Sequence, residues 1–422
     1  MSEISQVWPR RKSSADRISG LLLPALARRI RFGRLTLRTP GGGICDLGGT
    51  QSGPNGELQL HSWRMLWRLI SGASGFAEGY LAGEWDSPDL PALLNLLGSN
   101  LPDRRVIPRG LPWRRLARAI EDRRRSNSRA GARGNIARHY DLGNDFYRLW
   151  LDESLTYSAA IFEGPDEDLQ AAQTRKYRRI AELAGLAHGQ RILEIGCGWG
   201  GFAIWAAREI GCHVTATTIS EAQYALAAQR ISEAGLGDRV TLMRRDYRDI
   251  AGRFDRIVSI EMLEAVGESY WPVFMKKLRE SLAPGGRIAL QVIVISDKAF
   301  PRYRTGVDFI QKHVFPGGML PAPAVLRRAA ETAGLAWRRS YSHGDDYART
   351  LRIWGRNFAA AWPEIVVLGF DERFRRLWQF YLAYCEAGFR IGRIDVLQVA
   401  LDAECDATAT STTPASAVKQ ST

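Results

Sequence analysis

The chain has 422 residues, 45% of them hydrophobic, and a formal net charge of +13, which predicts two globular units with short tails. Its five cysteines are scattered, odd in number and without a CxxC pair, so they indicate neither a disulfide framework nor a zinc site and fit a reducing cytosol. No apolar run reaches the roughly 20 residues of a bilayer span, so we expect neither a signal peptide nor a transmembrane helix.

The N-terminal quarter predicts a small mixed domain behind a polar arm. Residues 1–20 carry too little apolar surface to fold, and we expect them to be disordered. Within 21–100, "RIRFGRLTLRTP" alternates with period two, as a strand does, and "HSWRMLWRLI" has helical spacing. We expect an α+β domain over 21–100.

A basic segment follows over residues 101–138, with twelve arginines against three acidic residues. Its middle, 113–125, has the pattern of a basic amphipathic helix. Clustered arginines bind either nucleic-acid phosphates or anionic lipid headgroups. No nucleic-acid-binding motif accompanies the charge, so we expect this linker to contact anionic lipid headgroups at a membrane surface, and no nucleic acid.

The rest of the chain alternates helical segments with short apolar strands. Such an alternation predicts parallel βαβ units in a doubly wound, mostly parallel, Rossmann-like sheet. The expected strands are "RILEIG", "HVTATTI", "VTLMRR", "FDRIVSIEML" and "RIALQVIVI".

The first expected strand runs into a glycine-rich turn, "RILEIGCGWGGF". Ligands of such sheets bind at this turn. The turn lacks the lysine of a Walker A loop and does not match GxGxxG, so it indicates neither a nucleoside triphosphate nor a clear dinucleotide site. Glu194 ahead of the glycines favours a cofactor that carries positive charge, and S-adenosylmethionine has a cationic amino group and sulfonium. The candidate cofactor residues here are Glu194, Gly196, Cys197, Gly198 and Gly200.

The turns after the next two strands offer further polar groups. "TTISEAQ" supplies Thr218, Ser220 and Gln223 where a ribose would lie, and "RRDYRD" supplies Asp246 for an adenine amino group and Tyr247 for stacking. Three suitable turns in the correct strand order predict a class I S-adenosylmethionine-dependent methyltransferase fold.

Longer motifs carry a family resemblance. "ARHYDLGNDFYRLWLDESLTYS", "SIEMLEAVGESYW", "DFIQKHVFPGGMLP" and "YLAYCEAGFRIGRIDVLQVAL" resemble the cyclopropane fatty acid synthases and related mycolic acid methyltransferases, over about 135–401. "FAEGYLAGEWDSPDLPALL" is similar to the lipid-associated domain of the phospholipid-acting members. The resemblance implies methyl transfer to the double bond of an unsaturated acyl chain of a membrane phospholipid, with bicarbonate removing a proton to close a cyclopropane ring.

The resemblance also assigns roles to single positions. Tyr157 and Ser158 would contact the cofactor from the segment before the sheet. Glu264 would hold the bicarbonate, Ile293 would bind it through its backbone, and Tyr347 would close the site.

Two positions depart from the family pattern. Ala159 stands where the typical synthase has a cysteine, and Gln291 stands where it has a bicarbonate-binding histidine. An amide donates and accepts hydrogen bonds but does not titrate near neutral pH. The product therefore stays open, with ring formation as the leading outcome and a methyl-branched or methylene chain as the alternative.

Other classes of function stay open as well. An RNA or small-molecule methyltransferase and a catalytically inactive lipid-binding protein are the alternatives. We expect the methyltransferase domain over 139–401, a disordered tail over 402–422, and a cytoplasmic protein held peripherally at the inner face of the membrane. The family often forms dimers, which leaves a homodimer open.

Overall fold

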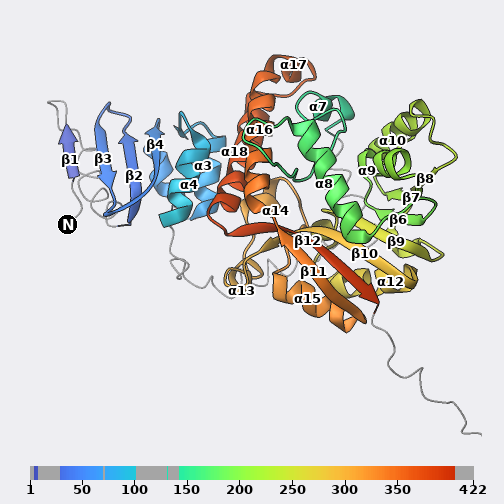
Figure 1. The fold of residues 1–422 in the computed structure, drawn as a ribbon. Helices are drawn as coiled ribbons and strands as arrows, with labels where there is room; N and C mark the ends of the chain where they lie inside the picture. The colour runs from blue at the N-terminus through green and yellow to red at the C-terminus, as the bar shows by residue number, and fades with distance from the viewer. Residues whose placement is uncertain (1–3, 8–28, 70–71, 101–130, 132–141, 404–422) are drawn as a thin grey trace, which may run out of the picture.

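Two β-sheets organise the computed structural model, which describes residues 4–7, 29–69, 72–100, 131 and 142–403. Figure 1 shows the smaller sheet at the N-terminal end, the larger sheet at the other end, and the long helices α16 and α18 between them.

The smaller sheet has five strands in the order β1-β3-β2-β4-β5. Leu35 and Leu37 of β2 are buried on one face of the sheet, as the period-two pattern predicts. This face packs against α4, whose Leu93 and Leu96 are also buried. The expected strand and helix of this domain are confirmed as β2 and α2. The elements are β1 Ile4–Val7, β2 Phe32–Arg38, β3 Ile44–Gly48, β4 Gln51–Leu60, α2 Arg64–Arg68, α3 Ala73–Leu81, β5 Trp85–Asp86 and α4 Leu90–Asn100.

The expectation of a disordered arm over 1–20 is wrong for residues 4–7. They form β1, which pairs antiparallel with β3 because the edge of β3 offers unpaired backbone groups. The remainder of the arm and the basic linker 101–138 lie outside the described residues, apart from Gly131. Strand β12 continues through Ala403, past the expected start of the tail, and 404–422 also lie outside the described residues.

The larger sheet has seven strands in the order β11-β12-β10-β9-β6-β7-β8. Strands β6 to β10 are parallel to one another, and these are the five strands expected from the sequence. The class I methyltransferase fold is thereby confirmed, with β11 and β12 added antiparallel at one edge. The strands are β6 Arg191–Ile195, β7 His213–Thr218, β8 Val240–Arg244, β9 Phe254–Ile260, β10 Leu282–Ile295, β11 Leu335–Ser342 and β12 Ile394–Ala403.

The order of the strands decides where a ligand can bind. Strands β7 and β8 lie on one side of β6, and β9 and β10 lie on the other, so the chain reverses its direction across the sheet beside β6. In doubly wound sheets a crevice opens at this point, outside the carboxyl ends of the strands. The turns after β6 and β9 both face this crevice.

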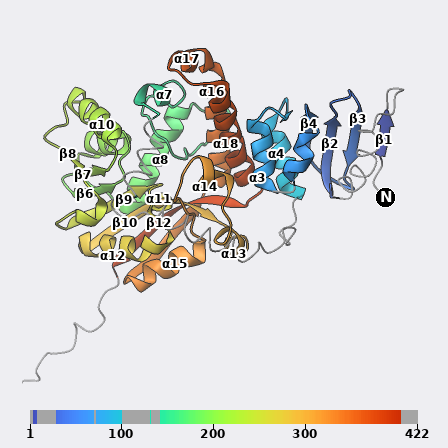
Figure 2. The same cartoon turned by 180° about the vertical axis from the view of Figure 1, so that it is seen from behind.

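Helices cover both faces of the larger sheet, as the two opposite views in Figures 1 and 2 show. The helices of residues 142–403 are α7 Asn144–Arg148, α8 Leu169–Ala184, α9 Gly201–Trp205, the π-helix η2 Ala206–Ile210, α10 Glu221–Glu233, the 3₁₀ helix η3 Tyr247–Asp249, α11 Leu263–Val266, the 3₁₀ helix η4 Glu268–Tyr270, α12 Trp271–Ser281, α13 Phe300–Tyr303, α14 Phe309–His313, α15 Pro323–Thr332, α16 Gly344–Ala360, α17 Trp362–Val367 and α18 Glu372–Arg390.

Helix α18 joins the two parts of the molecule. Its Arg376 donates to the backbone oxygens of Tyr80 (2.6 Å) and Trp85 (2.9 Å) and to the carboxylate of Asp86 (3.0 Å) in the small domain. Among the described residues, no helix combines the length and the apolar character that a bilayer span requires.

Candidate active site

The glycine turn after β6 has the backbone shape that a closely bound ligand requires. Gly196, Gly198 and Gly200 have φ of 81°, 54° and 82°, a region that favours glycine. A Cβ atom on Gly196 would lie 2.7 Å from Cγ of Met262, so no larger residue fits there. Gly196, Cys197 and Gly198 line a large cavity, whereas Gly200 begins α9 and does not line it.

Glu194 lies beneath this turn with one carboxylate oxygen available to a ligand. It is buried, and the N–H of Ala203 hydrogen-bonds to its carboxylate. Within the described part of the chain its Oε2 has no hydrogen-bond partner. Burial raises the pKa of Glu194 to about 8, and the charge of Lys176 opposes this shift. A cationic group entering the cavity would stabilise the ionised carboxylate.

Several polar side chains in the turns after β7 and β8 are already bonded to other protein groups. Thr218 donates to Oε1 of Gln223 at 2.9 Å, and both line the cavity. Ser220 instead caps α10 by accepting from the N–H of Gln223, and it does not line the cavity. Asp246 lines the cavity, but its carboxylate is paired with Arg248 at 2.7 Å.

The remaining cofactor candidates also line the cavity. Tyr247 does so with a hydroxyl that has no hydrogen-bond partner among the described residues. The hydroxyl of Tyr157 lies 2.7 Å from that of Tyr381. Ser158 accepts a hydrogen bond from the fully buried ammonium of Lys176.

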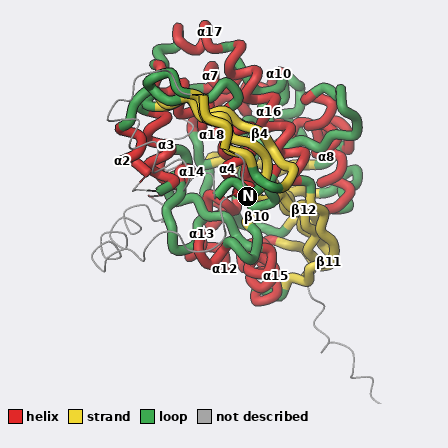
Figure 3. The backbone as a smooth tube through the Cα atoms, turned by 90° about the vertical axis from the view of Figure 1, so that its left-hand side faces the viewer, coloured by secondary structure: helices red, strands yellow, loops and turns green. Residues whose placement is uncertain are grey.

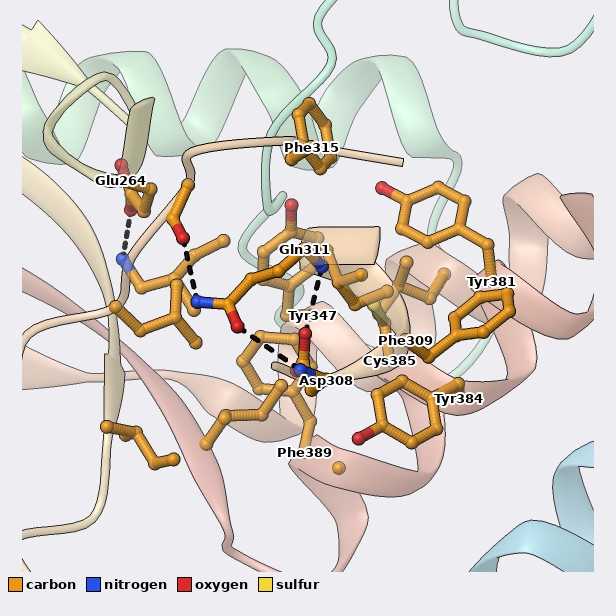
Figure 4. A pocket seen from close by; sticks show the side chains of 18 of the residues that line it. Glu264, Asp308, Phe309, Gln311, Phe315, Tyr347, Tyr381, Tyr384, Cys385 and Phe389 are labelled. Atoms are coloured by element: carbon orange, nitrogen blue, oxygen red, sulfur yellow. Dashed lines mark hydrogen bonds between the residues drawn. The ribbon is translucent and has the colours of Figure 1, made fainter. Parts of the chain in front are cut away.

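Glu264 and Ile293 meet across the carboxyl ends of β9 and β10. The N–H of Ile293 donates to Oε1 of Glu264 (Figure 4). Oε2 of Glu264 is buried and, among the described residues, has no partner. Burial, and after it the negative charge of Glu261, raise the pKa of Glu264 to about 8. This carboxyl group therefore carries a proton over much of the neutral range.

The other three residues predicted for the catalytic site, Ala159, Gln291 and Tyr347, all bind a second glutamate, Glu261. Oε1 of Glu261 accepts from the N–H of Ala159 at 2.8 Å and from Nε2 of Gln291 at 2.7 Å. Oε2 accepts from the hydroxyl of Tyr347 at 2.8 Å. Gln398 orients this arrangement by donating to the amide oxygen of Gln291 at 3.0 Å. A protein carboxylate thus stands where the sequence interpretation placed a free anion.

The backbone at Glu261 supports a special role for this residue. Its φ is 50°, a left-handed conformation that costs a non-glycine residue about 1 kcal/mol or more. Burial raises its pKa, whereas Lys176 and the three donors favour the ionised form. The sequence interpretation missed Glu261, although it lies three positions before Glu264 and is accompanied by the change of histidine to glutamine at 291. These two features together were the available signal.

One cavity of about 1660 Å³ is lined by the cofactor candidates named above other than Gly200 and Ser220, and by Glu261, Glu264, Ile293 and Tyr347. Ala159 and Gln291 do not line it and contact Glu261 from behind its wall. Cavities for a single small ligand measure roughly 300–1,000 Å³, so this one has room for a cofactor and a second large ligand. Beyond the polar groups the wall is aromatic and apolar, with Phe315, Tyr347 and Tyr381 around it (Figure 4). The cavity continues to Leu37 and Leu94 of the small domain. Its volume and apolar lining suit a long apolar chain that extends from the cofactor turns towards the small domain.

Comparisons with known proteins agree with this geometry. Residues 127–399 match the family described as "Mycolic acid cyclopropane synthetase". The chain is 41% identical to the tuberculostearic acid methyltransferase UfaA1 of Mycobacterium tuberculosis, over 81% of this chain and 82% of that protein. It is 34% identical to the cyclopropane-fatty-acyl-phospholipid synthase of Escherichia coli strain K12, over 78% of this chain and 83% of that protein. A solved structure of the mycolic acid cyclopropane synthase CmaA1, complexed with SAH and CTAB, has a TM-score of 0.60 and 30% identity, covering 64% of this chain and 97% of that one.

Proposed function

Because the chain belongs to the mycolic acid cyclopropane synthetase family and is an S-adenosylmethionine-dependent fatty acid methyltransferase, we propose that it methylates the double bond of an unsaturated acyl chain of a membrane phospholipid and releases a methylene-branched chain. The observation that carries this proposal is the position of Glu261 among the groups expected to bind bicarbonate.

The cofactor residues suit S-adenosylmethionine, which supplies an electrophilic methyl group when it is bound. The unpartnered Oε2 of Glu194 suits its cationic end, and the glycine turn permits a close approach of the backbone. Thr218, Gln223 and Tyr247 line the same cavity and would hold the remainder. We propose that these residues fix the methyl group in line with the double bond, since an alkene is a weak nucleophile and requires this alignment.

Methyl transfer to the alkene leaves a cation on the acyl chain. The faces of Tyr157 and Tyr347 in the cavity wall can stabilise this cation. A hydride then shifts from the methyl-bearing carbon to this cation, which leaves the positive charge on the methyl-bearing carbon. The carboxylate of Glu261 takes a proton from the new methyl group, and the electrons of the broken C–H bond form the π bond of the methylene group. Charge balances in this step, because one methyl cation is gained and one proton is lost.

Bicarbonate does not fit beside Glu261 in this arrangement. Ala159, Gln291 and Tyr347 already donate to the Glu261 carboxylate, which presents two oxygens and a single negative charge as the CO₂⁻ part of bicarbonate does. A second anion there would meet like charge in a buried site. We therefore propose that Glu261 replaces bicarbonate as the base.

The same anchoring favours a branched product. Ring closure requires the new methyl group to lose a proton while the cation is still on the other carbon of the former double bond. A hydride shift from the methyl-bearing carbon removes the cation from that position, and this shift needs no base. Both products lose their proton from the new methyl group, so the order of the two events decides between them. Glu261 is covalently attached and held by three donors, so it cannot move towards the methyl group ahead of the hydride shift as a small bound ion can. The similarity to a tuberculostearic acid methyltransferase supports this preference. A saturated branch would require a separate hydride donor.

Ring formation is the second candidate, and the unpartnered Oε2 of Glu264 is the observation that favours it. Expression in cells that lack cyclopropane lipids, followed by proton NMR of the extracted fatty acid esters, tests the choice. Both products gain the mass of one CH₂, so mass alone does not distinguish them. Vinylidene protons are the expected result, and upfield cyclopropane protons without vinylidene protons would overturn the proposal.

A further inference from the structure

We propose that the outer edge of the cavity is a docking surface for an anionic lipid bilayer, with Trp67 as its interfacial anchor. This inference deepens the proposed function, because it rests on a lipid substrate, and it names the surface through which that substrate enters. The described residues that both line the cavity and are exposed mark its openings. They are Arg29, Arg31, Phe32, Leu69, Ala73, Arg245, Arg302, Gly306 and Val307.

The charges at these openings have one sign. Of the exposed lining residues that the structure describes, every charged one is an arginine. Arg245 adjoins Asp246 and belongs to the cofactor end of the cavity. The other arginines lie where the small domain and α13 meet the cavity, and guanidinium groups there are complementary to lipid phosphates.

An apolar group accompanies this charge. We call Trp67, Leu69, Ala73, Arg302 and Val307 the rim. Trp67 is 76% exposed, Leu69 47% and Val307 37%. Trp67 does not itself line the cavity but stands in the chain between Met65 and Leu69, which do, and tryptophan is enriched at the level of the lipid headgroups.

The elements of the rim lie on one side of the molecule. Figure 3 shows α2 next to α3, with α14 and α13 along the same side, and Figure 2 shows α3, α14 and α13 neighbouring one another. Glu78 of α3 binds Lys312 at 2.8 Å and His313 at 2.9 Å, both from α14, and so holds the two halves of the opening together.

A bilayer is the occupant that fits all of these features. An acyl chain that leaves a bilayer must reach the apolar cavity without crossing water, which requires the opening to face the membrane directly. Exposed aromatic and aliphatic side chains at the opening bury in the interface, and arginines beside them bind anionic headgroups.

Co-sedimentation of the full chain with vesicles tests this surface. One set of vesicles contains phosphatidylcholine alone, and the other contains phosphatidylcholine with phosphatidylglycerol. Trp67→Ser is expected to weaken partition into both by roughly tenfold, because one large side chain no longer buries in the interface. Arg302→Gln is expected to weaken partition about fivefold, and only into the anionic vesicles.

The control is Val367→Ser, which changes an apolar side chain that is 85% exposed on α17 and does not line the cavity. It is expected to bind vesicles as the wild type does. Equal effects of Trp67→Ser and Val367→Ser would overturn the proposal, as would a concentration-dependent dimer in solution that Trp67→Ser abolishes, since a second copy would then cover the rim.

Two readouts separate this proposal from the proposed function. Unchanged S-adenosylmethionine binding and an unchanged thermal midpoint show that Trp67→Ser is folded, and its methylation of lipid dispersed in detergent is expected to equal that of the wild type. If the wild type docks through the rim but methylates no lipid, the proposed function fails while the docking surface stands. Full vesicle binding by the Trp67→Ser protein contradicts the docking surface whatever the activity.

Discussion

Replacing Glu261 by glycine should convert the enzyme to one that depends on bicarbonate. Glycine adopts the φ of 50° at this position without strain, and the substitution removes the carboxylate while leaving Ala159, Gln291 and Tyr347 in place. Three hydrogen-bond donors would then surround a space of about the size of a small anion. The change tests whether the protein carboxylate acts as the base.

The expected magnitudes follow from these contacts. A positioned general base contributes about 10²–10⁴ to a rate, so kcat without bicarbonate should fall at least about 100-fold. Leaving donors unpaired in a buried site costs about 1–3 kcal/mol each, which water entering the space partly offsets. The free energy of unfolding should therefore fall by about 1–3 kcal/mol, and affinity for S-adenosylmethionine should stay near that of the wild type.

The assay compares methylation in buffer free of carbon dioxide and in buffer with added bicarbonate. The Glu261→Gly variant should regain activity with bicarbonate and produce cyclopropane. The wild type should respond little. Glu261→Gln is the matched control, because it fills the same space with a neutral amide and should be inactive in both buffers. A wild type that loses its activity without bicarbonate would refute the reasoning, since the ion would then be the base in the presence of Glu261.

Three further changes probe the charges and the junction between the domains. Because the pKa of Glu194 is raised to about 8 and a cationic ligand prefers the ionised form, the affinity for S-adenosylmethionine measured by calorimetry should rise with pH towards about 8, and Glu194→Gln should remove this dependence. Lys176→Met removes the cation that favours ionised Glu261, so the acidic limb of the pH–rate profile should move to higher pH; an unmoved limb would contradict this role. Arg376→Ala should lower the free energy of unfolding by about 2–4 kcal/mol in urea titrations, because it breaks three contacts with the small domain, whereas the exposed Arg373→Ala should change it by less than about 0.5 kcal/mol.

The raised pKa values of two buried carboxyl groups also make the free energy of unfolding depend on pH. In the folded chain the pKa values of Glu194 and Glu264 are raised to about 8 from 4.5. A group of this kind contributes stability that is fully present below pH 4.5 and is lost as the pH rises through about 8. The ligand-free protein is therefore expected to lose stability progressively as the pH rises from 4.5 to about 8.

The sequence alone determined the parts of this protein that depend on local pattern. The five parallel strands, the glycine turn and the order of the cofactor turns could be predicted, because apolar periodicity and turn chemistry act between residues close in the chain. Parallel strands bring such turns to one edge of a sheet, so a cofactor site near Glu194 followed from the strand order.

Only the tertiary structure decided which polar groups are already taken and which are available to ligands. Ser220 proved to be a helix cap and Asp246 the partner of Arg248, through bonds that the residue types alone do not distinguish from cofactor contacts. Glu261 meets Ala159 and Tyr347 across separations of 102 and 86 residues, respectively. Contacts at such separations arise from how the sheet and α16 pack together, which no local pattern records. The sequence offered only Glu261 near Glu264 and the glutamine at 291 as a signal, and the folded chain showed that these residues meet.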